Sequence, residues 1–148
     1  MKTLLARLVW GRRARAALAA ARADLATTSV DVLVARVHAR PLGAPAPGSL
    51  RGFARALRAA LEADGEPRPC LPRALALLRE GRARGTAATL VLGVARTPDP
   101  ARPVVAHAWL EAGGAPFLEG ADPAKAYVEV ARFPPDTDAS APHPLPPD

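Results

Sequence analysis

One cysteine in this 148-residue chain is a candidate nucleophile. Cys70, the sole cysteine, follows Pro69 at the point where a helical pattern begins. Free N–H groups and the positive dipole end at a helix N-terminus lower the pKa of a thiol, so this place suits a reactive thiolate. A lone cysteine is otherwise a small buried hydrophobe, and residue type alone favours that second interpretation. The thiol therefore needs a base beside it before it can be regarded as a nucleophile.

His107 is the histidine that can supply this base. It lies in the middle of a strand pattern, with Trp109 two residues further on and hence on the same face. A histidine is costly to bury in a strand without a partner, so its role is either structural or chemical. His38 ends a helical pattern, where it can interact with the helix C-terminus, and His143 lies in a Pro-rich tail.

An acid that orients the imidazole would complete a Cys–His–acid triad. Glu111 shares the strand and face of His107 but lies about 13 Å away, at about 3.3 Å per residue. Glu119 pairs with His107 on one face if 112–114 form a three-residue loop, whereas a two-residue turn points Glu119 to the other face. Asp122 is the reserve candidate. Glu119 thus belongs to the site only in the three-residue register.

Other chemistries lack the residues they need. One cysteine and three scattered histidines form no metal-ligand cluster, and a single cysteine excludes an intrachain disulfide. Neither G-x-x-x-x-G-K-[ST] nor G-x-G-x-x-G occurs, so no nucleotide site is predicted. The sequence therefore predicts a protein without a cofactor or a metal.

The elements that must position the cysteine and the histidine change in kind along the chain. Four stretches have a helical pattern: residues 12–25, 28–39 with a cap at Thr28-Ser29, 50–61 with Ser49 as cap, and 71–80 closed by Gly81. Four later runs have a strand pattern: residues 88–95, 103–111, 116–119 and 127–133. Helices followed by an antiparallel sheet predict an α+β domain.

The length of the chain fits one domain over residues 1–133, helical over 1–81 and mainly β over 86–133. Six of the fifteen residues in 134–148 are proline, which predicts a disordered tail.

The charge and hydropathy of the chain bear on whether it binds nucleic acid or enters a membrane. The net charge is +6, but arginines are spread over several segments without interleaved aromatic residues, which favours solvated helix faces over a nucleic-acid site. Arg7 interrupts the N-terminal apolar run, and Arg22 and Asp24 interrupt the Ala-rich stretch that follows. We therefore expect a soluble, cytoplasmic protein with no signal peptide and no membrane span.

Three segments carry a resemblance to a known family. C-L-P-R-A-L-A-L-L starts at Cys70, Leu92-Gly93-Val94 follows, and A-H-A-W-L-E places His107 37 residues after Cys70. These segments resemble the lasso peptide biosynthesis B2 proteins, which are transglutaminase-like cysteine peptidases. The resemblance covers roughly Ser49 to Phe133.

This resemblance implies a papain- or transglutaminase-like core and cleavage of a leader from a ribosomally made precursor peptide. Cys70 would attack as thiolate, and His107 would act as base and then as acid. The third member in the family is usually an Asp on the next strand, and Glu119 stands at the matching position here. The implied partners are the precursor peptide, a separate leader-binding B1 protein and an ATP-dependent lasso cyclase.

Two alternatives remain open at this point. One is another acyl-transfer enzyme with the same Cys–His–acid arrangement, such as a transglutaminase or an arylamine-type acyltransferase, although those are usually larger. The other is a non-catalytic basic module that binds peptide or nucleic acid.

Overall fold

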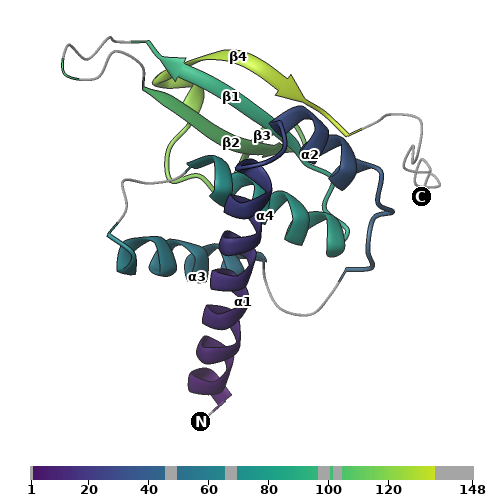
Figure 1. Cartoon of the computed structure of the whole chain (residues 1–148), viewed down its shortest axis with the longest axis vertical. Coiled ribbons are helices and arrows are strands. Elements are labelled where there is room, and N and C mark those ends of the chain that lie inside the picture. Colours follow the sequence, from purple (N-terminus) through teal and green to yellow (C-terminus); the bar gives the residue numbers. More distant parts are fainter. Residues whose placement is uncertain (1, 46–49, 66–69, 97–100, 102–104, 136–148) are drawn as a thin grey trace, which may run out of the picture.

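The computed structural model describes residues 2–45, 50–65, 70–96, 101 and 105–135, with side chains from Leu8 onward. Its helices are α1 (Lys2–Leu25), α2 (Val30–His38), α3 (Leu50–Ala63) and α4 (Cys70–Ala83). Its strands are β1 (Thr89–Ala95), β2 (Ala106–Ala112), β3 (Ala115–Phe117) and β4 (Tyr127–Phe133), with a short 3-10 helix η1 (Pro123–Lys125) before β4. The predicted α+β fold, helices first and an antiparallel sheet afterwards, is confirmed (Figure 1).

Two helix bounds differ from the sequence prediction. Helix α1 begins at Lys2 rather than near residue 12, because Leu, Ala and Arg favour a helix. Helix α4 continues through Gly81, and the left-handed residue after its end is Gly85, whose φ is 79° and whose N–H donates to the carbonyl of Arg82. The predicted cap Ser49 and most of the predicted tail, residues 136–148, lie outside the described residues.

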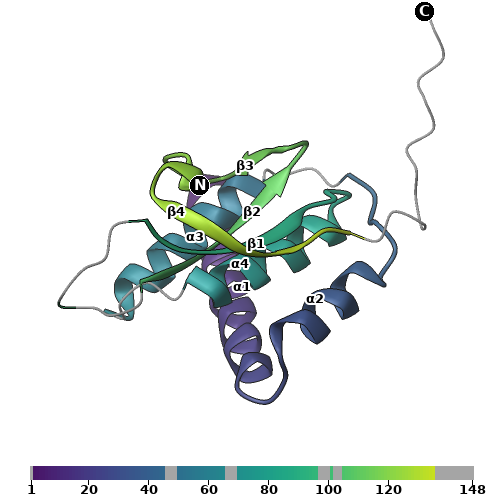
Figure 2. The same ribbon diagram turned by 90° about the horizontal axis from the view of Figure 1, so that it is seen from above.

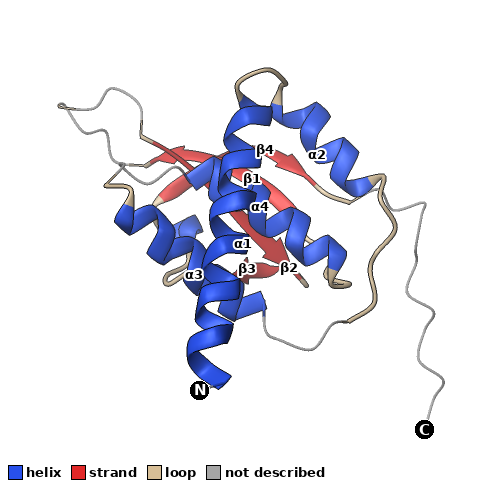
Figure 3. Ribbon diagram, turned by 60° about the horizontal axis from the view of Figure 1, so that its bottom comes forward, coloured by secondary structure: helices blue, strands red, loops and turns tan. Residues whose placement is uncertain are grey.

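The sheet is antiparallel and has the strand order β3-β2-β1-β4. Figures 2 and 3 show the helices gathered on one of its faces, with α4 lying beneath the strands. Strand alternation turns Leu90 and Leu110 toward this helical layer, where they join a core with Phe53 of α3 and Leu75 of α4. These four side chains are at most 2% exposed, so this layer is the main hydrophobic core.

The opposite face of the sheet carries the other half of the strand residues. Val91 pairs with Trp109 there, and Gly93 pairs with His107. Val91 and Trp109 are buried although they are not part of the main core, and the ring of Tyr127 lies 6.4 Å from that of Trp109. A small aromatic cluster thus forms on the side of the sheet away from the helices.

Ion pairs and capping contacts join the helices to one another. Glu80 of α4 is 7% exposed and accepts from Arg13 of α1 and from Arg84. Arg82 of α4 donates to the carbonyls of His38 and Arg40 at the end of α2. These contacts hold α1 and α2 against the helix that begins at Cys70.

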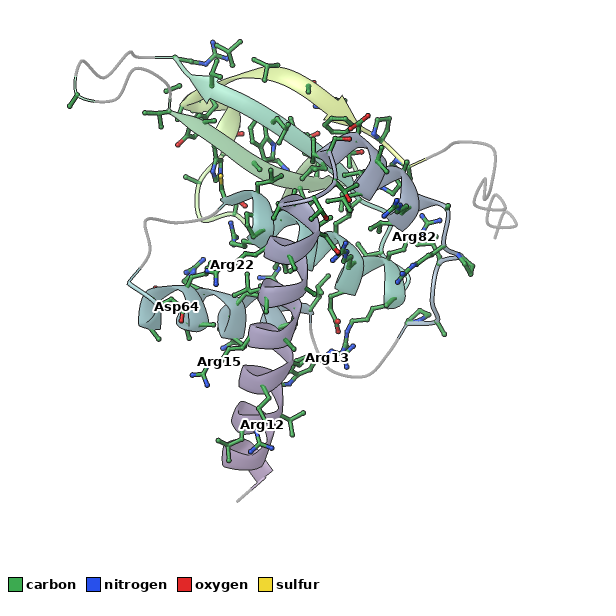
Figure 4. All side chains as sticks on the ribbon, viewed as in Figure 1. Arg12, Arg13, Arg15, Arg22, Asp64 and Arg82 are labelled. Carbon is green, nitrogen blue, oxygen red and sulfur yellow. The ribbon has the colours of Figure 1, made fainter. Side chains whose placement is uncertain are left out.

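The N-terminal part of α1 projects away from the sheet (Figure 1). Figure 4 shows Arg12, Arg13 and Arg15 along this projecting part. It also shows Arg22 near Asp64, the residue after α3, with Nη1 of Arg22 3.4 Å from Oδ2 of Asp64. Within the described ranges, none of the helices combines the length and the apolar character needed to cross a bilayer.

Candidate active site

Helix α4 brings Cys70 to the outer edge of β2. Cys70 is the first residue of α4, and its Sγ lies 3.9 Å from the carbonyl oxygen of Ala106, while the N–H of Ala108 donates to the sulfur. Strand β3 ends at Phe117, opposite Leu110, so it does not reach this part of β2. The carbonyl of Val105 accepts from the N–H of Ala95 on β1. Because the backbone groups of an antiparallel strand alternate in direction, those of Ala106 and Ala108 point away from β1. The thiol occupies the place where a longer β3 would have paired.

The His107 ring packs against two aromatic rings that also lie beside each other. Its ring stacks on Tyr127 with centroids 4.9 Å apart, and on Trp109 with centroids 5.9 Å apart and 18° between the planes. Trp109 thus shares the face of His107, as the strand alternation predicted. Tyr127 belongs to β4, so it must reach across β1 to touch a ring on β2.

Gly93 makes this reach possible. It lies on β1 directly opposite His107. A Cβ at this position would lie 2.8 Å from Cζ3 of Trp109, closer than real Cβ contacts allow, and 3.0 Å from Cβ of Tyr127, which is tighter than most. The absence of a side chain at Gly93 is therefore a condition for the aromatic cluster around His107.

The hairpin between β2 and β3 has a two-residue turn. Ala112 pairs with Ala115 and Leu110 with Phe117, and the two turn glycines have φ values of 61° and 78°, as a type I′ turn requires. Of the two loop lengths that the sequence left open, the structure therefore has the two-residue turn.

Glu119 nevertheless lies beside His107. Its Oε2 is 3.6 Å from Nε2 of His107, and the two side chains are 13% and 20% exposed. The alternation of strand faces stops at Phe117, and Leu118 adopts a φ of 58°, which turns the chain. The condition that tied Glu119 to a three-residue loop was wrong because it extended the strand two residues too far.

The other acidic candidates are engaged elsewhere. Asp122, the reserve candidate, caps η1 through a hydrogen bond from the N–H of Ala124 to its Oδ1. Glu111 accepts from Trp109 Nε1 at 3.2 Å and from Arg132 at 2.7 Å. Among the described residues, Glu119 is the carboxylate that forms an ion pair with His107.

Arg73 was not singled out from the sequence, and it contacts the acid directly. It lies three residues after Cys70, on the same side of α4. Its Nη1 donates to Oε1 of Glu119 and its Nη2 to the carbonyl of Leu118, both at 3.1 Å. The sequence signal was an arginine within one turn of the cysteine, directly before the apolar run 74–78.

The thiol and the imidazole favour each other's charged form. A hydrogen bond with Cys70, then one with Glu119, raises the pKa of His107 to about 9 although burial opposes this. Burial would raise the pKa of Cys70, but the hydrogen bonds from His107 and from the Ala108 N–H outweigh it and lower that pKa. The pair is therefore arranged to exist as thiolate and imidazolium.

The same balance keeps Glu119 ionised. Burial works to raise its pKa, but the hydrogen bond with His107 and the charge of Arg73 lower it below its usual range. A carboxylate, an imidazolium and a thiolate in contact can carry out nucleophilic acyl transfer, with the acid orienting the ring.

The remaining candidates have other places in the structure. His38 is 5% exposed, and its Nε2 lies 3.1 Å from the carbonyl oxygen of Ala88, which precedes β1. His143 lies outside the described residues. Over the ranges that the structure describes, no three His, Cys, Asp or Glu side chains are grouped to hold a metal ion.

Comparison with known proteins gives one family. The model of the transglutaminase-like superfamily matches residues 5–132, which include all of α2 to β3 and most of α1 and β4. No curated protein and no solved structure matches the chain significantly.

Proposed function

Since the chain belongs to the transglutaminase-like superfamily, we propose that it is a cysteine peptidase that removes the leader from a lasso peptide precursor. Cys70 is the nucleophile, His107 is the base and acid, and Glu119 orients the imidazole. The superfamily includes cysteine peptidases and acyltransferases.

The observation that carries this proposal is the contact of three side chains at one place. A thiol at the first residue of a helix interacts with an imidazole, whose far nitrogen lies 3.6 Å from a carboxylate. Because Nε2 of His107 faces Glu119, Nδ1 is the nitrogen left for Cys70. This arrangement has the order of nucleophile, base and orienting acid that acyl transfer needs.

The reaction follows from these roles. The Cys70 thiolate attacks the scissile carbonyl carbon and forms a C–S bond, and the imidazolium of His107 gives its proton to the leaving amine as the C–N bond breaks. Water then attacks the thioester while His107 takes one of its protons. The C–S bond breaks, the peptide leaves as a carboxylic acid that loses its proton to solvent, and the thiolate–imidazolium pair is restored. The backbone N–H of Cys70, at the start of α4, is suited to stabilise the oxyanion.

The choice of a leader as substrate is supported by the residues that resemble the lasso peptide biosynthesis B2 proteins. C-L-P-R-A-L forms the start of α4, and H-A-W-L-E forms most of β2, so both segments lie at the candidate site. The partners that go with this substrate are the precursor peptide, a separate leader-binding B1 protein and a lasso cyclase. We expect activity to depend on the B1 protein.

The test is a processing assay with the purified chain, a lasso precursor peptide and a B1 protein, both taken from the genes that we expect on either side of its own. Mass spectrometry should detect separate leader and core peptides with the native chain and neither with Cys70→Ala. The melting curve of Cys70→Ala should match that of the native chain, so that loss of activity is not loss of fold. Processing by Cys70→Ala would overturn the peptidase assignment.

The same assay separates the alternatives. An acyltransferase would attach an added amine to the peptide without needing the leader. A non-catalytic basic module would bind the precursor without cleaving it and would tolerate His107→Gln.

A further inference from the structure

We propose that Arg73 is a positioning residue that holds Glu119 against His107 and thereby links the acid to the helix that carries Cys70. The proposal rests on the catalytic roles proposed above and adds a fourth residue to them.

The need for such a residue follows from where Glu119 lies. Strand pairing ends at Phe117, and the left-handed φ of Leu118 places the next residues outside the sheet. No ladder hydrogen bond from β2 therefore fixes the segment that carries the acid. Another contact must hold it in place if its carboxylate is to stay near Nε2 of His107.

Arg73 supplies this contact with two parallel donors. One end of its guanidinium binds the Glu119 carboxylate, and the other binds the carbonyl of Leu118. The fork thus fixes both the side chain of the acid and the backbone just before it. Arginine suits this task better than lysine, because the planar guanidinium presents paired donors in fixed geometry, whereas an ammonium is a point charge on a flexible stem.

The carboxylate of Glu119 is shared between two cations. Its Oε1 accepts from Arg73, and its Oε2 faces Nε2 of His107. The Arg73 and Glu119 side chains are 15% and 13% exposed, so solvent screens their interaction less than that of a surface pair. Turning the carboxylate away from His107 would also break the bond to Arg73.

Because Arg73 and Cys70 lie three residues apart on α4, one helix places both the nucleophile and the acid. Three residues of an α-helix rise about 4.5 Å. A rigid helical turn therefore sets the spacing between the thiol and the clamp that holds Glu119.

The positive charge of Arg73 and its hydrogen bonds to Glu119 and Leu118, which act as a clamp on the acid, have opposite effects on the pKa of His107. A positive charge close to His107 disfavours the imidazolium, so its removal alone would raise the pKa of His107. Loss of the clamp releases Glu119, so the pKa of His107 would fall. Among the described residues, the charged and titratable groups that face His107 and Glu119 are Cys70 and Arg73 from α4 and Tyr127 from β4.

The test is to measure the pKa of His107 by NMR titration of ring-labelled histidine in the full chain. The chain has three histidines, so His107→Gln assigns the signal. Arg73→Gln should lower the pKa of His107 by about one unit or more, and Arg73→Lys by less, because lysine keeps the charge but not the fork. Arg79→Gln is the matched control, since Arg79 lies on the same helix and pairs with Asp24 at 2.6 Å, away from the site. It should leave the pKa unchanged.

A second set of variants, built on Glu119→Gln, tests whether Arg73 acts through Glu119. In Glu119→Gln, adding Arg73→Gln should not lower the pKa of His107 further, because there is no longer an acid to position. An unchanged or raised pKa in Arg73→Gln alone would overturn the proposal. If Arg73→Gln fails to fold, Arg73→Lys carries the test, and a pKa equal to that of the native chain would overturn it.

Failure of this proposal is distinguishable from failure of the proposed function. Alkylation of Cys70 by iodoacetamide needs no peptide substrate. If native Cys70 reacts only as the pH of the solution approaches the pKa of an ordinary thiol, the nucleophile assignment fails, whatever Arg73 does. If native Cys70 reacts at lower pH and Arg73→Gln leaves His107 unaffected, the role of Arg73 alone fails.

Discussion

The rings of His107 and Tyr127 are stacked with their centroids 4.9 Å apart, although a whole strand, β1, separates the strands that carry them. The contact exists because the β1 residue opposite His107 is Gly93, above which the rings of Trp109 and Tyr127 pack. The orientation of the candidate base thus depends on three strands, of which only one carries a residue of the proposed triad.

Gly93→Ala should damage both stability and activity. The new methyl group would lie 2.8 Å from Trp109 and 3.0 Å from Tyr127, so the rings must move. Overpacking of this kind costs about 1–3 kcal/mol, which denaturant unfolding can measure. Since small misplacements of catalytic groups cost on the order of 10²-fold in rate, leader processing should fall by a similar factor.

Gly11→Ala is the control for the glycine change. Gly11 lies in α1, and a Cβ there would meet no atom within 4 Å. This substitution should stabilise the protein by about 0.5–1 kcal/mol, because alanine favours a helix more than glycine does. Equal losses in the two variants would contradict the packing explanation for Gly93.

Glu119→Gln should lower the pKa of His107 from about 9 toward its ordinary value of 6.5, because the neutral amide stabilises the imidazolium less. Processing should fall by about 10²–10⁴-fold, the range over which general acid–base groups contribute. Asp122→Asn is the control, since asparagine caps a helix as well as aspartate does. If Asp122→Asn abolishes processing and Glu119→Gln does not, Asp122 is the orienting acid.

The pH dependence of processing should be bell-shaped. On the acid side the rate rises as the thiolate forms, at a pH below the ordinary Cys value of 9.0, because the pKa of Cys70 is lowered. On the alkaline side the rate falls through about pH 9, where the His107 imidazolium loses the proton that the leaving amine needs. Rates measured from pH 5 to pH 10 check both limbs, and a rate that keeps rising above pH 9 would exclude the imidazolium as acid.

Glu80→Ala should destabilise the helical layer without changing the site. Glu80 is 7% exposed and accepts hydrogen bonds from Arg13 and Arg84, so its loss removes these charge-assisted bonds, at a cost of about 1–3 kcal/mol. Glu129→Ala removes an exposed pair with Arg132 and should cost at most about 1 kcal/mol. Urea unfolding of both variants gives the comparison, and similar losses would show that burial of Glu80 is not important.

Local patterns were enough to place the candidate nucleophile and the candidate base on their elements. A proline followed by apolar positions at helical spacing predicted the helix start, and α4 does begin at Cys70. The period of two in the strand put Trp109 on the face of His107, and their rings stack. Both features depend on residues close together in the chain, for which the periodicity of a single element is sufficient.

The position of the acid depends on a conformation that its residue type does not signal. The two glycines of the turn allowed either loop length, and Leu118 is not a residue type that marks a left-handed φ. Similarly, the contact of Tyr127 with His107 requires the strand order, and that of Arg73 with Glu119 requires the placement of α4 against β2. Tertiary packing, rather than propensity, determines all three.

The early end of β3 has a consequence for engineering. The pairing of β2 with β1 sets the position of His107, while residues 118–122 form a separate loop after β3 that carries the carboxylate. This loop can therefore be exchanged or lengthened to change the position of the carboxylate while the hydrogen bonds of the sheet stay intact. A replacement loop would need a carboxylate and a carbonyl that match the guanidinium of Arg73 on α4, and libraries that vary the loop and residue 73 together are the natural starting point.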